Sequence, residues 1–122
     1  MRLFLVRHGE TRWNQERRVQ GGGSDIALNE RGQRQAEGIG QALRGEPVAA
    51  IYSSTMRRAL ETALAIARLH SLPVWLEPEL KEIDAGDAEG LSFEELPRRH
   101  PQFWAQWREG TGSIRWPGGE SL

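Results

Sequence analysis

The feature that most constrains this chain is its opening run, in which the apolar residues 3–6 are followed at once by Arg7, His8 and Gly9. Four apolar residues are too few for a helix and predict a buried central strand. Functional sites in α/β proteins form where strands end. A guanidinium holds phosphoryl oxygens in a bidentate fork, a neutral imidazole can attack phosphorus, and a glycine lets the backbone approach a ligand. The tripeptide alone is more often incidental than catalytic, so its interpretation depends on the rest of the chain.

Helices and strands alternate after this run. A helix is predicted from the N-cap Asn29 to Arg44, with apolar residues on one face and a glycine just beyond it. Residues 48–52 predict a second buried strand, which is followed by a helical pattern to about residue 69 and by a third short strand at 73–76. Such alternation predicts parallel strands joined by right-handed crossovers. The expected fold class is α/β, with a mostly parallel central sheet and helices on both faces.

The last third of the chain is less regular. Ser92 and Glu95 have the spacing of a capping box for a short helix, which Pro97 is expected to interrupt. Pro101 is a favourable first residue for a second helix. The aromatic residues of that helix are interpreted as core, and they are Phe103, Trp104 and Trp107. The arginines of this region are interpreted as a solvated face, and they are Arg98, Arg99, Arg108 and Arg115.

Length and charge exclude several classes of protein. A chain of 122 residues has room for one hydrophobic core, so one domain spanning residues 1–122 is expected. The net charge of -1 argues against a nucleic-acid or membrane partner and makes any anion site local. There is no cysteine, no cluster of metal ligands and no nucleotide P-loop, so neither a metal nor a cofactor is expected. No apolar run is long enough for a signal peptide or a membrane span, which favours a cytoplasmic protein.

Two further segments fit phosphate chemistry. The serines at 53–54 follow the second predicted strand and precede a helix that starts with Arg57 and Arg58. Free backbone N–H groups and two guanidinium groups at a strand end form an anion site. Glu82 follows the third strand, and packing against the apolar Ile83 would raise the pKa of its carboxyl group, which could then act as a general acid. A solvent-facing acidic loop is the alternative interpretation of Glu82.

Together these segments resemble the histidine phosphatase superfamily, also called the phosphoglycerate mutase-like family. The resemblance covers essentially the whole chain, and the motifs follow the family's order. The run that begins at Arg7, with Asn14, is similar to the family signature, which implies His8 as the phosphorylated nucleophile and Arg7 and Asn14 as phosphate ligands. Residues 52–63 are similar to the second motif, which implies Arg58, and not the arginine before it, as the second phosphate-binding arginine.

The resemblance also implies a proton donor. Glu82 stands at the donor's position in its motif, and residues 117–122 are similar to the turn that opens the family's next helix. The glycine loop at 21–24 departs from the family pattern, because it is one residue longer than usual and lacks the aromatic residue often found there. No binding role is therefore assigned to this loop.

A second departure concerns a later histidine. The family uses a second active-site histidine, in a His-Gly pair on a later strand, and neither His70 nor His100 is followed by glycine. We therefore expect the 122 residues to be the front part of a longer chain, a single incomplete domain that lacks a C-terminal strand and helix. In the family that strand packs beside the one ending at His8. Its absence predicts an open edge in the sheet and an isolated fragment that is inactive and either unstable, prone to aggregate or able to borrow a strand.

The function implied by this resemblance is metal-independent hydrolysis of a phosphomonoester through a phosphohistidine intermediate. The sequence around Glu82 resembles the small phosphatase branch, which includes α-ribazole phosphatase, more than the glycolytic mutase. A phosphoglycerate mutase and a catalytically inactive phosphate-binding domain are the alternatives. The substrate is expected to be a small phosphorylated metabolite, which residues 92–116 do not identify. The oligomeric state stays open, with a homodimer as one possibility.

Overall fold

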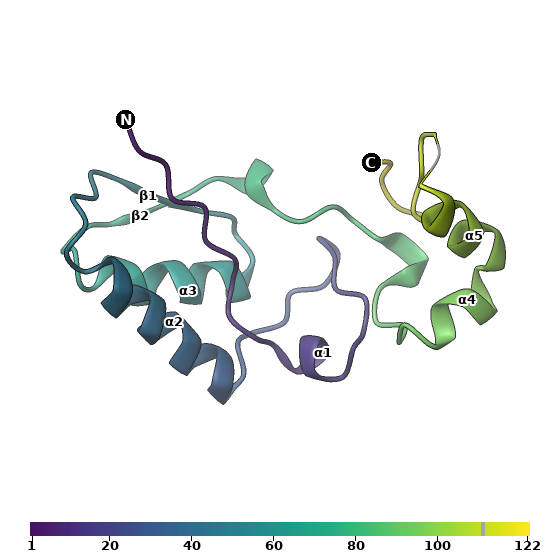
Figure 1. Cartoon of the computed structure of the whole chain (residues 1–122), viewed down its shortest axis with the longest axis horizontal. Helices are drawn as coiled ribbons and strands as arrows, with labels where there is room; N and C mark the ends of the chain where they lie inside the picture. Colours follow the sequence, from purple (N-terminus) through teal and green to yellow (C-terminus); the bar gives the residue numbers. More distant parts are fainter. Residues whose placement is uncertain (111) are drawn as a thin grey trace. The chain divides into compact units, whose positions relative to one another are not determined.

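The computed structural model describes residues 1–110 and 112–122, and these divide into two compact units (Figure 1). The first, called here the sheet unit, comprises Met1–Thr11 and Ile26–Lys81. The second, called the loop unit, comprises Arg12–Asp25 and Glu82–Leu122. Whether both belong to one incomplete domain stays a prediction.

The sheet unit has α/β architecture. Its elements in chain order are α2 (Glu30–Leu43), β1 (Ile51–Ser53), α3 (Arg57–Ala67), β2 (Val74–Leu76) and the short 3-10 helix η1 (Pro78–Leu80). β1 and β2 pair in parallel, with Tyr52 opposite Trp75. α3 connects the two strands and packs against both of them. The predicted α/β class with parallel pairing is confirmed, although β1 is shorter than the predicted strand and lies closer to the serine pair.

α2 begins where the sequence predicts. The side-chain oxygen of Asn29 accepts a hydrogen bond from the backbone N–H of Gly32 at 2.8 Å, which satisfies one of the unpaired N–H groups of the first turn. α2 packs side by side with α3 (Figure 1). A small buried cluster of Leu28, Ala36 and Ala65 lies between these helices. The apolar face predicted for the first of these helices is thus buried, at Ala36, against the second.

The prediction for residues 3–6 is wrong in part. No strand is assigned there, and the side chains are exposed, from 38% for Phe4 to 88% for Leu5. A parallel strand requires hydrogen-bonding neighbours, and β1 pairs only with β2 in the part of the chain that the structure describes. The apolar run is therefore neither the strand nor the buried segment that the sequence predicts, and the expected open edge beside it stays a prediction.

The loop unit contains short helices joined by long connections. Its elements are α1 (Arg12–Gln15), the 3-10 helix η2 (Gly86–Ala88), α4 (Glu95–Arg99) and α5 (Pro101–Glu109). Its core consists of Val19, Ala85, Ala88, Leu96, Phe103, Ile114 and Trp116. Val19 ties the two segments of the unit together, because its N–H donates to Leu91 and its carbonyl accepts from Gly90. This unit supports the acidic loop that carries Glu82.

The capping box predicted for α4 is present. The Glu95 N–H donates to the Ser92 hydroxyl at 3.1 Å, and the Ser92 N–H donates to the Glu95 carboxylate at 3.4 Å. Pro97 does not interrupt this helix, contrary to expectation, because it lies in the first turn, where no intrahelical N–H bond is lost.

The aromatic stripe of α5 is only partly buried. Phe103 is a core residue, and its ring centroid lies 4.6 Å from that of Trp116. Trp107 also contacts Trp116, at 5.1 Å, but it is 40% exposed. The core interpretation therefore holds for Phe103 and fails for Trp107. The four arginines interpreted as a solvated face are exposed.

Candidate active site

The loop that carries His8 is tied to α3 through a threonine. The backbone N–H of Gly9 donates to the Thr62 hydroxyl at 3.0 Å, and that hydroxyl donates to the Arg58 carbonyl at 2.8 Å. Gly9 and Thr62 are both buried. This relay joins the first and second motifs within one unit and fixes the backbone beside His8 relative to the helix turn that carries Arg58.

The imidazole of His8 has a defined tautomer in its neutral form. Its Nδ1 atom lies 2.6 Å from the Gly9 carbonyl oxygen. A carbonyl can only accept a hydrogen bond, so Nδ1 must carry the proton. The lone pair of the neutral ring is then on Nε2. In this tautomer of the half-buried ring, Nε2 is the nitrogen whose lone pair could attack phosphorus.

The N-terminal end of α2 holds the other side of this loop. The Glu10 N–H donates to the Gln35 side chain at 2.9 Å, and the Glu10 carbonyl accepts from the Asn29 N–H at 3.0 Å. Glycines at positions 9 and 32 permit this approach, because a Cβ on Gly9 would collide with the Gly32 carbonyl and a Cβ on Gly32 would collide with the Glu10 carbonyl. The loop is thus held between α2 and α3 by backbone contacts.

The arginines differ in their surroundings. Arg58 is 2% exposed, whereas Arg57 and Arg7 are exposed. Burial of a guanidinium is unfavourable unless it is paired or hydrogen-bonded, so an arginine retained inside the protein has a specific task. This difference is consistent with Arg58, and not Arg57, as the predicted phosphate ligand.

Thr62→Val should weaken this arrangement. Valine has a similar shape but removes the hydroxyl, which leaves the buried Gly9 N–H unpaired. We expect the free energy of unfolding to fall by about 1–3 kcal/mol, as measured by urea denaturation of the gene product that contains these residues. Thr62→Ser keeps the hydroxyl and serves as the matched control. An equal loss in both variants would show that the methyl group, and not the hydrogen bonds, is responsible.

The other two predicted site residues belong to the loop unit. Asn14 lies in α1 and is half-buried. Glu82 is exposed, and its Oε1 accepts a hydrogen bond from the Ile83 N–H at 3.0 Å. Of the two interpretations of this segment, the structure therefore has the solvent-facing acidic loop and not the packing of the Glu82 carboxyl group against Ile83. The side chain turns back on its own backbone and does not enter the core.

The arginines that flank Asn14 are engaged with a carboxylate. Arg12 and Arg18 each place Nε within 3.0 Å of Glu16, and the hydrogen bond from Arg18 lowers the pKa of the Glu16 carboxyl group. Arg18 also donates to the Gly90 carbonyl at 2.8 Å. These contacts join Arg12 and Arg18 to Glu16, and Arg18 also to the segment that contains Gly90.

Sequence reasoning missed the residues that hold the site together. Thr62 was recognised as part of a motif but was given no role, and Gly32 was not singled out. The available signal was spacing, since Thr62 is four residues after Arg58 on one helix and its hydroxyl can reach that carbonyl. The partner in the first motif is 53 residues away and follows only from the fold.

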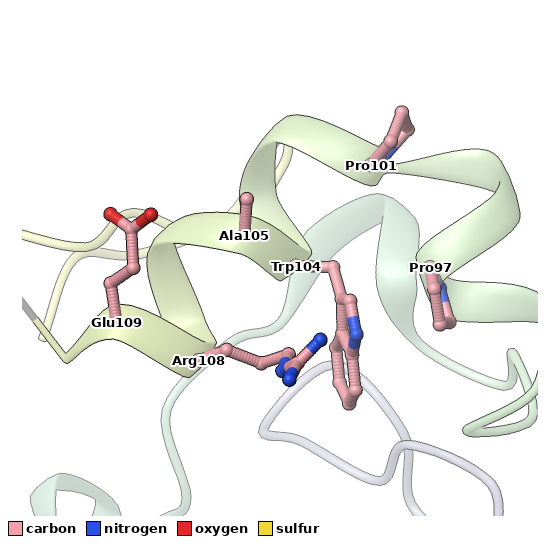
Figure 2. A pocket seen from close by; sticks show the side chains of 6 residues that line it. All are labelled: Pro97, Pro101, Trp104, Ala105, Arg108 and Glu109. Carbon is pink, nitrogen blue, oxygen red and sulfur yellow. The ribbon is translucent and has the colours of Figure 1, made fainter.

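Two hollows in the described part of the chain are lined by none of the predicted site residues. A groove of about 410 Å³ on the α4–α5 pair has its lining labelled in Figure 2, where the Arg108 guanidinium turns toward the Trp104 ring and Glu109 points away. A second hollow, of about 510 Å³, lies between α2 and α3. Within the described ranges, no three His, Cys, Asp or Glu side chains are grouped to hold a metal ion, and no helix is long and apolar enough to cross a membrane.

The family model for the histidine phosphatase superfamily (branch 1) matches residues 3–122. This chain belongs to the histidine phosphatase superfamily. Phosphoserine phosphatase 1 of Hydrogenobacter thermophilus is 40% identical over 122 residues, which are the whole of this chain and 57% of the relative. A probable phosphoglycerate mutase of Yersinia pestis is 38% identical, again over the whole chain and 56% of the relative.

Solved structures of the superfamily agree with this fold. A mycobacterial glucosyl-3-phosphoglycerate phosphatase in complex with VO3 matches with a TM-score of 0.82 and 34% identity, covering 93% of this chain and 56% of that one. A putative α-ribazole-5'-P phosphatase from Escherichia coli matches with a TM-score of 0.84 and 29% identity, covering 94% and 56%. This histidine phosphatase sequence thus spans just over half the length of these superfamily members.

Proposed function

We propose that the gene product containing these residues is a phosphomonoester hydrolase that forms a phosphohistidine intermediate on His8. The observation that carries the proposal is the hydrogen bond from His8 Nδ1 to the Gly9 carbonyl, because it leaves Nε2 as the nucleophilic nitrogen. The Gly9–Thr62–Arg58 relay supports it, since nucleophile and phosphate ligand must keep a fixed separation for in-line attack.

In the proposed reaction, Nε2 of His8 attacks phosphorus while the phosphorus–oxygen ester bond breaks. The leaving oxygen takes a proton from the Glu82 carboxyl group. Water then attacks the phosphohistidine, the phosphorus–nitrogen bond breaks, and the water proton passes to the Glu82 carboxylate. Arg7, Arg58 and Asn14 stabilise the charge on the transferring phosphoryl group throughout.

The proposal extends to a second active-site histidine supplied by chain beyond these 122 residues. The support is that the curated relatives aligned over the whole of this chain are nearly twice as long. Charge stabilisation by arginine and histidine side chains makes the proposed reaction independent of a metal. We also propose a cytoplasmic location and a small phosphorylated metabolite as substrate, in keeping with the small metabolites named in the relatives.

A mutase is the second candidate function. The match to a probable phosphoglycerate mutase is nearly as strong as that to phosphoserine phosphatase 1, at 38% against 40% identity. A mutase would use the same phosphohistidine but would return the phosphoryl group to a hydroxyl of the product. Phosphoryl transfer between the hydroxyl groups of phosphoglycerate, faster than release of inorganic phosphate, would replace the hydrolase proposal by the mutase.

The deciding experiment is an intact-mass measurement of the native gene product followed by a p-nitrophenyl phosphate assay on the same sample. We expect a mass well above 13.8 kDa and hydrolysis that persists in excess chelator. A mass of 13.8 kDa without hydrolysis would overturn the proposal in favour of an inactive phosphate-binding domain. Loss of hydrolysis in the chelator would overturn the metal-independent mechanism alone.

A further inference from the structure

The glycine loop at 21–23, to which the sequence assigned no role, lies against the backbone of the segment that carries Glu82. Both belong to the loop unit. The Gly22 N–H donates to the Ile83 carbonyl at 2.8 Å. A Cβ on Gly22 would collide with the Glu82 carbonyl oxygen, and one on Gly21 would lie 2.6 Å from the Ile83 carbonyl oxygen. The two backbones can approach this closely only because these positions carry no side chain.

The third glycine of the loop, Gly23, differs from Gly22 because it faces side chains and not backbone. A Cβ on Gly23 would meet the carboxylate ends of Glu89 and Asp84, which are flexible side chains that can move aside. At Gly22 the obstacle is the backbone of Glu82 itself, which can give way only by shifting the peptide. A substitution at Gly23 would thus act through the Glu89 and Asp84 side chains, and one at Gly22 directly on the Glu82 peptide.

The peptide beside Gly22 also orients the Glu82 carboxyl group. The Ile83 N–H donates to Glu82 Oε1 at 3.0 Å, while the carbonyl of the same residue accepts from Gly22. The next residue, Asp84, is fixed from another direction, because its N–H donates to the Glu120 carboxylate at 2.7 Å. A shift forced at position 22 would therefore be taken up mainly at Glu82 and Ile83.

A carboxylate anchors the loop in this position. Glu89 Oε1 accepts a hydrogen bond from the Gly21 N–H at 2.5 Å. Hydrogen bonds to charged acceptors are stronger than neutral ones. Glu89 therefore holds the glycine loop against the backbone of residues 82–83.

We propose that Gly22, held in place by Glu89, is a positioning residue that aims the Glu82 carboxyl group at the leaving oxygen. The inference rests on the proposed function, in which Glu82 is the proton donor. General acid catalysis requires hydrogen-bond reach of the leaving atom, so a displaced carboxyl group loses its effect while the rest of the site keeps its own. The loop therefore affects proton donation to the leaving oxygen and not phosphate binding.

The test compares Gly22→Ala with wild type in the full gene product, on p-nitrophenyl phosphate and on phenyl phosphate. The phenyl leaving oxygen is more basic and needs the proton more. For Glu82→Gln we expect a loss of kcat/KM, which reports the step in which the leaving group departs, about 100-fold larger on phenyl phosphate than on p-nitrophenyl phosphate. Gly22→Ala should give the same selective loss, of about tenfold or more, and Gly23→Ala a smaller one. Added to Glu82→Gln, Gly22→Ala should cause no further selective loss.

The controls separate the possible failures. Gly38→Ala, in α2 with nothing near its added Cβ, should behave as wild type. If thermal denaturation shows that Gly22→Ala is unfolded, Glu89→Ala takes its place in the test, since it releases the loop without a collision and should show the same selective loss.

Equal losses on both substrates, with Glu82→Gln selective, would overturn the positioning role. An inactive wild-type protein would overturn the proposed function, and a non-selective Glu82→Gln would overturn both the donor assignment and this inference.

Discussion

His8→Ala in the full gene product is expected to lower kcat for p-nitrophenyl phosphate by at least about 10,000-fold, because removal of a covalent nucleophile eliminates the chemical step itself. Alanine also removes the hydrogen bond to the Gly9 carbonyl, but that bond joins neighbouring residues only. The long-range hydrogen bond from the Gly9 N–H to Thr62 is kept. The fold should therefore survive. Initial rates measure the loss of kcat. Radiolabelled substrate, with the reaction stopped without acid because phosphohistidine is acid-labile, measures the phosphoenzyme, which should be absent in His8→Ala.

A matched control uses another histidine of the chain. His100 precedes α5 and is half-buried, and no motif includes its side chain. His100→Ala should keep the wild-type kcat and the labelled phosphoenzyme. If His8→Ala retains both, the nucleophile lies elsewhere and the proposed mechanism falls. If the variant loses hydrolysis while wild type never forms a labelled intermediate, His8 acts as a general base toward water and the covalent step falls alone.

The features that sequence predicted correctly are those that depend on neighbours in the chain. The Asn29 cap, the Ser92–Glu95 capping box and the start of α5 at Pro101 each rest on contacts within four residues. Such signals are local, so they survive whatever the rest of the chain does.

The wrongly predicted strand at residues 3–6 depends on a distant partner. An apolar run such as residues 3–6 becomes a buried strand only when another strand pairs with it, and none does in the described chain. For Glu82 the sequence left packing against Ile83 and a solvent-facing loop both open, and the structure has the exposed form. Hydrophobicity indicates that a segment tends to be buried, but it does not identify the segment that packs against it.

The sequence predicted the individual residues of the candidate site, but it did not predict the contacts that hold them in place. His8 and Arg58 follow from motifs, whereas the Thr62 relay and the close backbone approach at Gly32 join segments far apart in sequence. Small residues carry no chemical signal of their own. Their role becomes visible only when the structure shows what an added atom would strike.

Arg58→Met is expected to lower kcat/KM for p-nitrophenyl phosphate by about 100- to 1,000-fold. Methionine keeps much of the length of the side chain and removes the guanidinium, so the main loss is charge stabilisation of the transferring phosphoryl group. The inhibition constant for inorganic phosphate should rise as well, because the same group binds the product. Steady-state rates with and without added phosphate provide both quantities.

Arg57→Met is the control, since Arg57 is adjacent, exposed and chemically identical to Arg58. It should leave kcat/KM and phosphate inhibition close to wild type. Arg58 is buried, so its replacement could also disturb folding, and thermal denaturation of both variants is measured in parallel. A folded Arg58→Met protein that keeps full activity would contradict its assignment as a phosphate ligand.

The pair of variants also tests how α3 is oriented toward the substrate. Successive residues of a helix point about 100° apart, so the exposed Arg57 and the buried Arg58 leave α3 in different directions. The Thr62 hydroxyl bonds the Arg58 carbonyl and the Gly9 N–H, which registers this helix turn against the His8 loop. If Arg57→Met caused the larger loss of phosphate binding, the exposed face of α3 would have to meet the substrate, and buried Arg58 would be a structural residue. The expected order, a large effect at Arg58 and a small one at Arg57, requires the buried guanidinium to reach the phosphate that His8 attacks.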